Sequence, residues 1–345
     1  MAEGESALVE LVKTRLREFW RERGIIFWVF GFPILMAVGL GLAFRSRPLE
    51  LSRVAVVASE RSTEVTALLE SERVEAALMD EASARRSLGR AKVDAIVKWQ
   101  GGQPTYLLDP MQEGGARARL VADEVLERAA GRKNVLQAKE EAVSERGSRY
   151  IDFLLPGLIG LNLMGSSMWG VGYNLVVARK RRLLRRYAVT PMRRSHFLLS
   201  YFFSRSFFLV IELAFLLAFG ALVFDTTVQG SYVAFTLVAF VGAASFAGIS
   251  LLIGARVENM ESANGWMNFV QLPMWVLSGA FFSYERFPEW LHAPIRLLPL
   301  TALVDGLRAI FNDAAGLLST WPQILVLAVW GAAGFAVALK TFRWQ

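Results

Sequence analysis

The chain has 345 residues, 54% of them hydrophobic, with 10 Trp, 24 Phe and a formal net charge of +7. This is more apolar surface than one soluble core can bury, and much of it lies in blocks of about twenty residues, long enough for a helix to cross a hydrocarbon layer. The composition therefore predicts an integral membrane protein, and the absence of cysteine excludes disulfides, thiolate metal sites and a cysteine nucleophile.

The first 44 residues contain a charged helix and an apolar run. Residues 7–22 predict an amphipathic helix, either lying in the headgroup layer or solvated and leading into the membrane, so we assign 1–24 to a cytoplasmic interfacial helix. The apolar run 25–44 is longer than that of a signal peptide and is followed by a polar segment. It predicts an uncleaved first transmembrane helix.

Residues 45–150 form a polar segment that carries 18 basic and 17 acidic side chains. Predicted strands and helices alternate along it, which indicates a small α/β domain inserted between the first two transmembrane helices. The predicted strands are 51–58, 93–99 and 105–109, and the predicted helices are 63–80 and 115–147.

Five further apolar blocks follow in the region 151–345. They predict transmembrane helices over 151–178, 203–224, 232–254, 265–283 and 320–339. An irregular stretch with several prolines, 284–319, lies before the last of them. The predicted fold is an α-helical integral membrane protein with six transmembrane helices and an inserted α/β extracytoplasmic domain.

The distribution of Lys and Arg predicts the orientation. If the N-terminus is cytoplasmic, the short inner segments carry sixteen of these residues and the short outer segments carry three. The positive-inside rule then places both termini in the cytoplasm and the α/β domain outside, where long loops escape the rule.

One inner segment, 179–194, carries eight basic side chains and no acidic one. Topology alone accounts for much of this charge. Nucleic-acid binding is not expected, because the segment is short, adjoins the membrane and contains no recognisable module. Leucine and tyrosine side chains interrupt the charge and Pro191 ends the helical pattern, so the segment could also be an amphipathic helix that packs into a groove of a cytoplasmic protein.

Two sequence blocks resemble a known family. The block RRLLRRYAVTPMRRSHFLLSYFFSR, 181–205, resembles the first cytoplasmic loop of permeases in the ABC type-2 exporter family. The block 268–310 resembles the same family through Leu-Ser-Gly-x-Phe-Phe, Pro-x-Trp-Leu and Leu-Pro-Leu-Thr, and 93–97 is similar to its larger members with a domain after the first span. The high arginine density at 179–186 departs from the family pattern.

The resemblance implies a permease that works with a separate ATPase. It implies two permease copies, as a homodimer or a heterodimer, two ATPase copies, residence in the cell inner membrane with contact to lipid, and a pair of re-entrant helices near 284–319. The residues of 179–194 that would contact the ATPase are Arg182, Leu183, Leu184, Tyr187, Thr190, Pro191 and Met192. The chain contains no phosphate-binding loop, so we expect it to bind no cofactor and the partner to bind ATP and Mg.

Polar side chains recur at helical spacing in two predicted spans. Such faces avoid lipid and point either to another helix, through hydrogen bonds, or to a transport pathway. The resemblance favours an amphiphile pathway between two permease copies. The second span contributes Asn162, Ser166, Trp169 and Tyr173, and the fifth contributes Asn264, Asn268, Gln271, Trp275 and Ser278.

Glu212 lies in the middle of the third span, where an ionised carboxylate costs roughly 2.5–3.5 kcal/mol. It could form interhelical hydrogen bonds, relay protons or bind a cationic substrate in the pathway. Arg205 lies two turns away on the same face, about 10 Å along the axis, which is too far for direct contact unless the long arginine side chain snorkels. The two histidines, His196 and His292, are too far apart in the topology for a metal site.

These observations favour an exporter permease that moves an amphiphile, such as a drug or a lipid. Two alternatives remain open. An ion-coupled secondary transporter would use Glu212 as its proton site, although such proteins often contain internal repeats that are not visible here. A membrane-anchored sensor or assembly factor would bind a ligand through the α/β domain, but it needs fewer spans.

Overall fold

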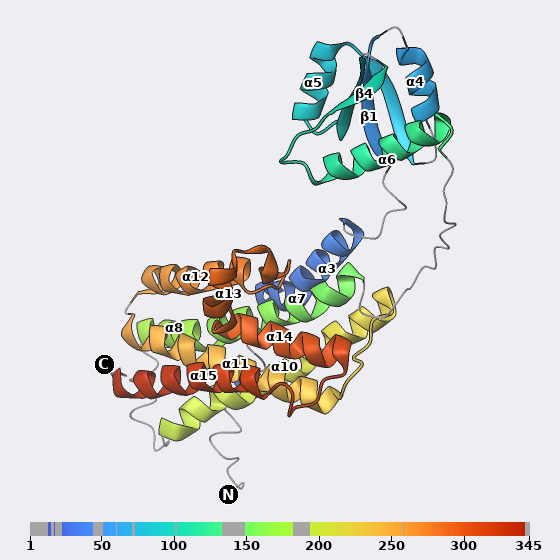
Figure 1. The fold of residues 1–345 in the computed structure, drawn as a ribbon. Coiled ribbons are helices and arrows are strands. Elements are labelled where there is room, and N and C mark those ends of the chain that lie inside the picture. The colour runs from blue at the N-terminus through green and yellow to red at the C-terminus, as the bar shows by residue number, and fades with distance from the viewer. Residues whose placement is uncertain are drawn as a thin grey trace, which may run out of the picture. The chain divides into compact units, whose positions relative to one another are not determined.

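The computed structural model describes residues 13–14, 17, 23–43, 51–59, 61–70, 73–100, 102–132, 149–181, 194–257 and 259–341. The chain forms two compact units, one of residues 1–45 and 144–345 and the other of residues 46–143 (Figure 1). We call them the helical unit and the α/β unit.

The α/β unit contains a four-stranded sheet with helices on both faces (Figure 1). Its elements are β1 (Ser52–Val57), α4 (Ser62–Leu69), β2 (Val74–Met79), α5 (Glu81–Gly89), β3 (Ala95–Gln100), β4 (Gln103–Leu107) and α6 (Glu113–Ala129). The strand order is β2-β1-β3-β4, in which β1 pairs in parallel with β2 and β3, and β4 pairs antiparallel with β3.

The alternation of side chains along β1 divides the core of the α/β unit between the two faces. Val54 and Val56 pack with α4 and α6 in one buried cluster. Ala55 lies between them in sequence and points to the other face, where it packs with Ala84 of α5 and Ile96 of β3.

The predicted helix 63–80 is wrong in its second half, because α4 ends at Leu69 and 74–79 is a strand. All six residues of β2 pair with β1, from Ser52 with Val74 to Val57 with Met79. This pairing outweighs the helix preference of the Glu, Ala, Leu and Met residues in β2. The sequence analysis also missed α5, whose start is marked by a capping bond from the Ser83 N–H to the Asp80 carboxylate.

The helical unit begins with α2 (Arg23–Ile26), the π-helical turn η1 (Phe27–Gly31) and α3 (Phe32–Ala43). The next helix is also interrupted by a π-helical turn, and it consists of α7 (Tyr150–Ser167), η2 (Met168–Tyr173) and α8 (Asn174–Lys180). The remaining elements are α10 (Arg194–Phe224), α11 (Tyr232–Arg256), α12 (Met260–Leu277), η3 (Tyr284–Arg286), α13 (Glu289–Arg296), α14 (Pro299–Asp313) and α15 (Trp321–Thr341).

Four helices of the described part are long and apolar enough to cross a membrane, over residues 150–180, 203–224, 232–256 and 321–341. A shorter apolar helix covers 27–43. The chain is therefore a multi-pass membrane protein. The fifth predicted span corresponds to α12, which has 18 residues, ends at Leu277 rather than near 283 and is not among the four, so the count of six spans stays a prediction.

Helix α11 lies at the centre of the helical unit and packs against α15, η2, α14 and α7. Small residues allow this close packing. A Cβ atom on Gly248 of α11 would lie 2.6 Å from the backbone oxygen of Gly331 in α15, and one on Gly172 of η2 would lie 2.3 Å from that of Ser250 in α11. The backbones are therefore in direct contact at both crossings.

The irregular stretch 284–319 contains the short helices η3, α13 and α14. Prolines delimit them, because Pro288 precedes α13 and Pro299 occupies the first turn of α14. Most residues of α14 are buried, and it packs beside α7 and α11 (Figure 1). The sequence predicts that a pair of short helices near 284–319 enters the membrane from outside, and this stays a prediction.

Candidate transport site

The predicted ATPase-contacting residues Arg182, Leu183, Leu184, Tyr187, Thr190, Pro191 and Met192 lie outside the described residues. The structure describes the helices on either side, α8 and α10. At the end of α8, Arg179 donates hydrogen bonds of 2.9 Å to the backbone oxygens of Gly254 and Val257. A guanidinium at this place satisfies the free carbonyls at the C-terminus of α11.

The predicted polar face of the second span divides into two parts at η2. Its first half turns toward the first and third spans. Asn162 donates through Nδ2 to the backbone oxygen of Val29 in η1, at 3.1 Å. Ser166 donates to the backbone oxygen of Asn162 at 2.6 Å and lies 3.3 Å from the Glu212 carboxylate of α10.

Glu212 and Arg205 form a buried, bidentate ion pair. Nη1 of Arg205 lies 2.9 Å from Oε1 of Glu212, and Nη2 lies 2.9 Å from Oε2. The guanidinium also donates to Ser166 Oγ at 2.6 Å and to Ser167 Oγ at 3.2 Å. The exposed fractions of the two charged side chains are 11% and 1%.

The sequence predicts contact between Arg205 and Glu212 only if the arginine side chain extends along the helix, and the structure shows that contact. Seven residues separate the two Cα atoms by about 10 Å along the axis, but side chains seven apart share one face of a helix. Long helical side chains lean toward the N-terminus, which directs Glu212 toward Arg205, and the extended arginine spans the remaining distance. Glu212 is consequently a paired carboxylate held inside the helical unit.

The second half of the predicted face contacts α12. Trp169 of η2 donates through Nε1 to Oε1 of Gln271 at 3.4 Å, and Nε2 of Gln271 lies 3.4 Å from the Met168 sulfur. The rings of Trp169 and Tyr173 pack with their centres 5.3 Å apart. This contact joins the two helices that the sequence analysis assigns to the pathway.

The predicted polar side chains of α12 do not share one environment. Gln271 and Ser278 are buried, whereas Asn268 is exposed. Two enclosed polar atoms, Oδ1 of Asn264 and Nε1 of Trp275, have no hydrogen-bond partner among the described residues. The exposed side of α12 is apolar and carries no formal charge between 266 and 276, and its large side chains are Trp266, Phe269, Leu272 and Val276.

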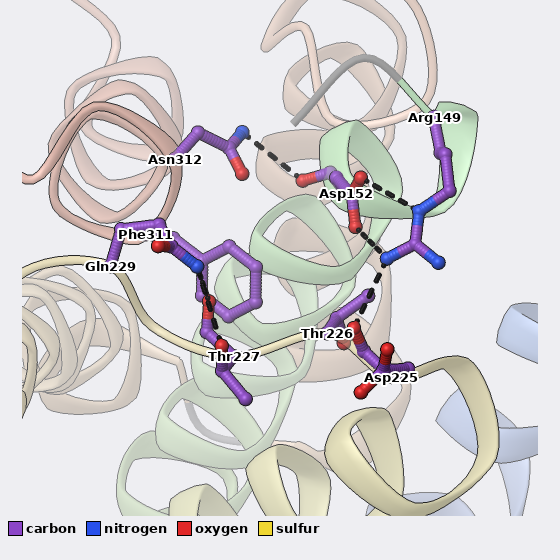
Figure 2. A pocket seen from close by; sticks show the side chains of 8 residues that line it. All are labelled: Arg149, Asp152, Asp225, Thr226, Thr227, Gln229, Phe311 and Asn312. Atoms are coloured by element: carbon purple, nitrogen blue, oxygen red, sulfur yellow. Dashed lines mark hydrogen bonds and ion pairs between the residues drawn. The ribbon is translucent and has the colours of Figure 1, made fainter. Parts of the chain in front are cut away.

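A polar cluster that was not predicted from the sequence lies where the start of α7, the segment after α10 and the end of α14 meet (Figure 2). Arg149 binds both carboxylate oxygens of Asp152, at 3.1 and 3.0 Å, and donates to the backbone oxygens of Phe224 and Asp225 at 2.9 and 3.2 Å. Asn312 of α14 donates to the backbone oxygen of Asp152 at 3.2 Å. In the sequence, the one signal for this cluster is Arg149, which stands three residues before Asp152 at the start of a predicted span.

A family model described as "ABC-2 family transporter protein" matches residues 23–340 of the chain. The chain belongs to the ABC-2 transporter family. Two curated relatives, both named "Inner membrane transport permease YhhJ", from Escherichia coli (strain K12) and Shigella flexneri, are 29% identical over 121 residues. The match covers 35% of this chain and 32% of each relative, so the chain spans about a third of the length of these relatives.

Within the described residues, no group of three or more His, Cys, Asp or Glu side chains could hold a metal ion. The contacts above instead connect helices. Four contacts join elements that are distant in sequence. They are made by Arg179, by Arg205 with Ser166 and Ser167, by Trp169 with Gln271, and by Arg149.

Proposed function

We propose that this chain is the permease subunit of an ATP-binding-cassette exporter, which moves an amphiphilic substrate out of the cytoplasm or the inner leaflet. The observation that carries the proposal is the ABC-2 family match over residues 23–340. The multi-pass helical unit supports it, because such a protein provides the transmembrane path for a separate ATPase.

We place the substrate pathway along η2 and the exposed side of α12. The Trp169–Gln271 contact supports this, since it joins the second half of the polar face of the second span to α12. The exposed apolar and aromatic side of α12 suits the apolar part of an amphiphile, and the exposed amide of Asn268 can bind its polar part. The paired Glu212 would support this pathway from the side of α10.

The proposed complex contains two copies of an ABC ATPase and two permease chains. The segment 179–194 would contact the ATPase, which binds ATP and Mg. The same proposal includes six spans, cytoplasmic termini and an extracytoplasmic α/β unit. The positive-inside distribution of Lys and Arg supports this orientation of the termini and of the α/β unit.

The contacts of Glu212 favour this proposal over an ion-coupled transporter. A proton site requires a carboxylate that gains and loses a proton during transport, whereas both oxygens of Glu212 are bound by Arg205. Loss of this charge would leave the guanidinium unpaired inside the helical unit, which is strongly destabilising.

The test is affinity purification of the tagged chain from native membranes in mild detergent, followed by mass spectrometry. The wild type should recover an ATPase with a phosphate-binding loop, and the triple variant Leu183→Glu, Leu184→Glu, Thr190→Glu should lose it. The control places three glutamates on exposed leucines of the α/β unit, Leu68→Glu, Leu78→Glu and Leu120→Glu, and should keep the ATPase. A folded wild type that recovers no ATPase would overturn the proposed function.

A further inference from the structure

A continuous chain of polar contacts connects three helices through the Arg205–Glu212 pair. It starts at the Val29 backbone oxygen in η1, which accepts from Asn162. The Asn162 backbone oxygen accepts from Ser166, and Ser166 lies within hydrogen-bond distance of both charged side chains. The chain therefore begins in the π-helical turn η1 and, through the bond from Arg205 to Ser167, ends at the residue before the π-helical turn η2. Such turns often mark functional sites.

The Arg205–Glu212 pair contacts the residue that directly precedes η2. Ser167, which accepts from Arg205, is the last residue of α7, and Met168 is the first residue of the π-helical turn. The next residue, Trp169, makes the contact with Gln271 of α12. A shift of the guanidinium would thus act on the backbone within two residues of this contact.

The Arg205–Glu212 pair is also connected to the N-terminal end of α10. This helix is continuous from Arg194 to Phe224, so it carries the pair on the same rigid element that begins at the basic segment 179–194. A movement of that segment along α10 would reach Arg205 without an intervening hinge.

Stability alone is a weak reason for such a pair. Removing two charges from water is costly, and a buried ion pair can often be replaced by apolar residues of similar volume without loss of stability. What a bidentate pair adds is a defined geometry, because the planar guanidinium fixes the direction of both partners. Here Arg205 and Glu212 both belong to α10, so the pair fixes the guanidinium on that helix, and the bonds of the guanidinium to Ser166 and Ser167 connect α10 to the end of α7.

We propose that Arg205 and Glu212 are positioning residues that transmit the displacement of α10 to η2 and to the Trp169–Gln271 contact. This inference rests on the proposed function, since the displacement would come from an ATPase bound at 179–194. Without the pair, α10 and η2 would still pack, but they would no longer move as one element when the ATPase binds ATP.

The test compares the double variant Arg205→Met/Glu212→Leu with a matched control, Arg128→Met/Glu124→Leu, which removes an exposed ion pair from the α/β unit. Because the chain contains no cysteine, spin labels can be attached at Asn174→Cys and Phe269→Cys, two exposed positions on α8 and α12. The distance between the two labels is measured in the purified permease–ATPase complex, with and without MgATP and vanadate. Labelled permease is diluted with unlabelled permease, so that the measured distance lies within one chain.

In the wild type and the control, MgATP and vanadate should shift the distance distribution. The double variant should bind the ATPase, keep its unfolding temperature within about 3 °C of the wild type, and lose at least half of the shift. The charge-swapped variant Arg205→Glu/Glu212→Arg should recover part of it, which a purely structural role would not predict.

Three results would overturn the inference. One is a double variant with the full shift, and another is a wild type that binds the ATPase but shows no shift. The third is a double variant that loses thermal stability and ATPase binding together, which would make the pair a determinant of folding only. Failure of the wild type to bind any ATPase would instead overturn the proposed function.

Discussion

The guanidinium of Arg308 in α14 lies 3.7 Å from the centre of the Phe153 ring in α7 and donates to the Phe153 backbone oxygen at 3.2 Å. It also donates to the backbone oxygen of Gly279, directly after α12, at 3.0 Å, and lies 3.9 Å from the Asp305 carboxylate. One side chain therefore holds the start of α7, the end of α12 and α14 together. In the sequence, Arg308 is one residue of the block 268–310 that resembles the ABC-2 family, and its contacts were not predicted.

Replacing Arg308 by methionine should destabilise the helical unit by about 2–4 kcal/mol. Two backbone oxygens lose their donor, the Asp305 carboxylate loses its paired charge, and the contact with the Phe153 ring is lost. Thermal unfolding in detergent measures the change. The control Arg286→Met removes an exposed arginine and should leave the unfolding temperature unchanged. Equal unfolding temperatures for the two variants would contradict the role given to Arg308.

Two glycines of η2 provide a matched pair for the packing against α11. A Cβ atom on Gly172 would lie 2.3 Å from the Ser250 backbone oxygen, whereas one on Gly170 would meet nothing within 4 Å. We expect Gly172→Ala to lower the free energy of unfolding by about 1–3 kcal/mol through overpacking. Gly170→Ala should be neutral or stabilising by up to about 1 kcal/mol, since alanine favours the helix. If both variants unfold alike, η2 does not pack as described.

Asn268 is exposed and Gln271 is buried. Variants of the two residues therefore distinguish a role in binding the substrate from a role in helix packing. Gln271→Leu removes the buried bond with Trp169 and should reduce stability by about 1 kcal/mol. Asn268→Leu should leave the unfolding temperature unchanged, because the side chain is exposed, but should alter the stimulation of the partner ATPase by amphiphiles. Stimulation identical to that of the wild type across a panel of amphiphiles would remove Asn268 from the proposed pathway.

The α/β unit contains a tyrosine that should respond to alkaline pH. Burial and the hydrogen bond from the Tyr106 hydroxyl to Asp123 raise the pKa of Tyr106 above its ordinary value. A raised pKa favours the neutral phenol in the folded state, so its contribution to stability is present below about pH 10 and is lost as the pH rises further. The phenolate absorbance of the wild type minus that of Tyr106→Phe should therefore rise at a higher pH than the absorbance of the average tyrosine of the chain. A difference curve centred at the ordinary tyrosine pKa would contradict the buried environment.

Local patterns predicted several elements closely. The predicted strand 51–58 corresponds to β1, and the apolar blocks 151–178 and 232–254 correspond to α7–α8 and α11. These predictions succeeded because block length and side-chain alternation depend on neighbouring residues only. The helix predicted over 63–80 failed at β2, where pairing with β1 gives the chain an alternative that local preference does not contain.

The partners of the candidate site residues did not follow from the sequence. Polar spacing identified Trp169 and Gln271 on their helices and left two alternatives open for such faces, hydrogen bonding to another helix or a pathway. Asn162 and Ser166 hydrogen-bond to η1 and α10. The division of the polar face of the second span comes from the π-helical turn at 168–173, because the wider turn rotates the later residues of the helix relative to the earlier ones. A regular helical spacing does not anticipate that turn.

The sequence by itself determined that the chain is a membrane protein with an intervening polar α/β segment, and its motifs indicated the ABC-2 family. These properties follow from summed hydrophobicity and local motifs, which do not depend on where other helices lie. Only the tertiary structure decided that Glu212 pairs with Arg205, that Gln271 meets Trp169 and that Arg308 holds three elements together. The physical reason differs between these contacts. The Glu212–Arg205 pair depends on the reach of two side chains along one helix. The other contacts depend on helix rotation and close packing, which are set only when distant segments are packed together.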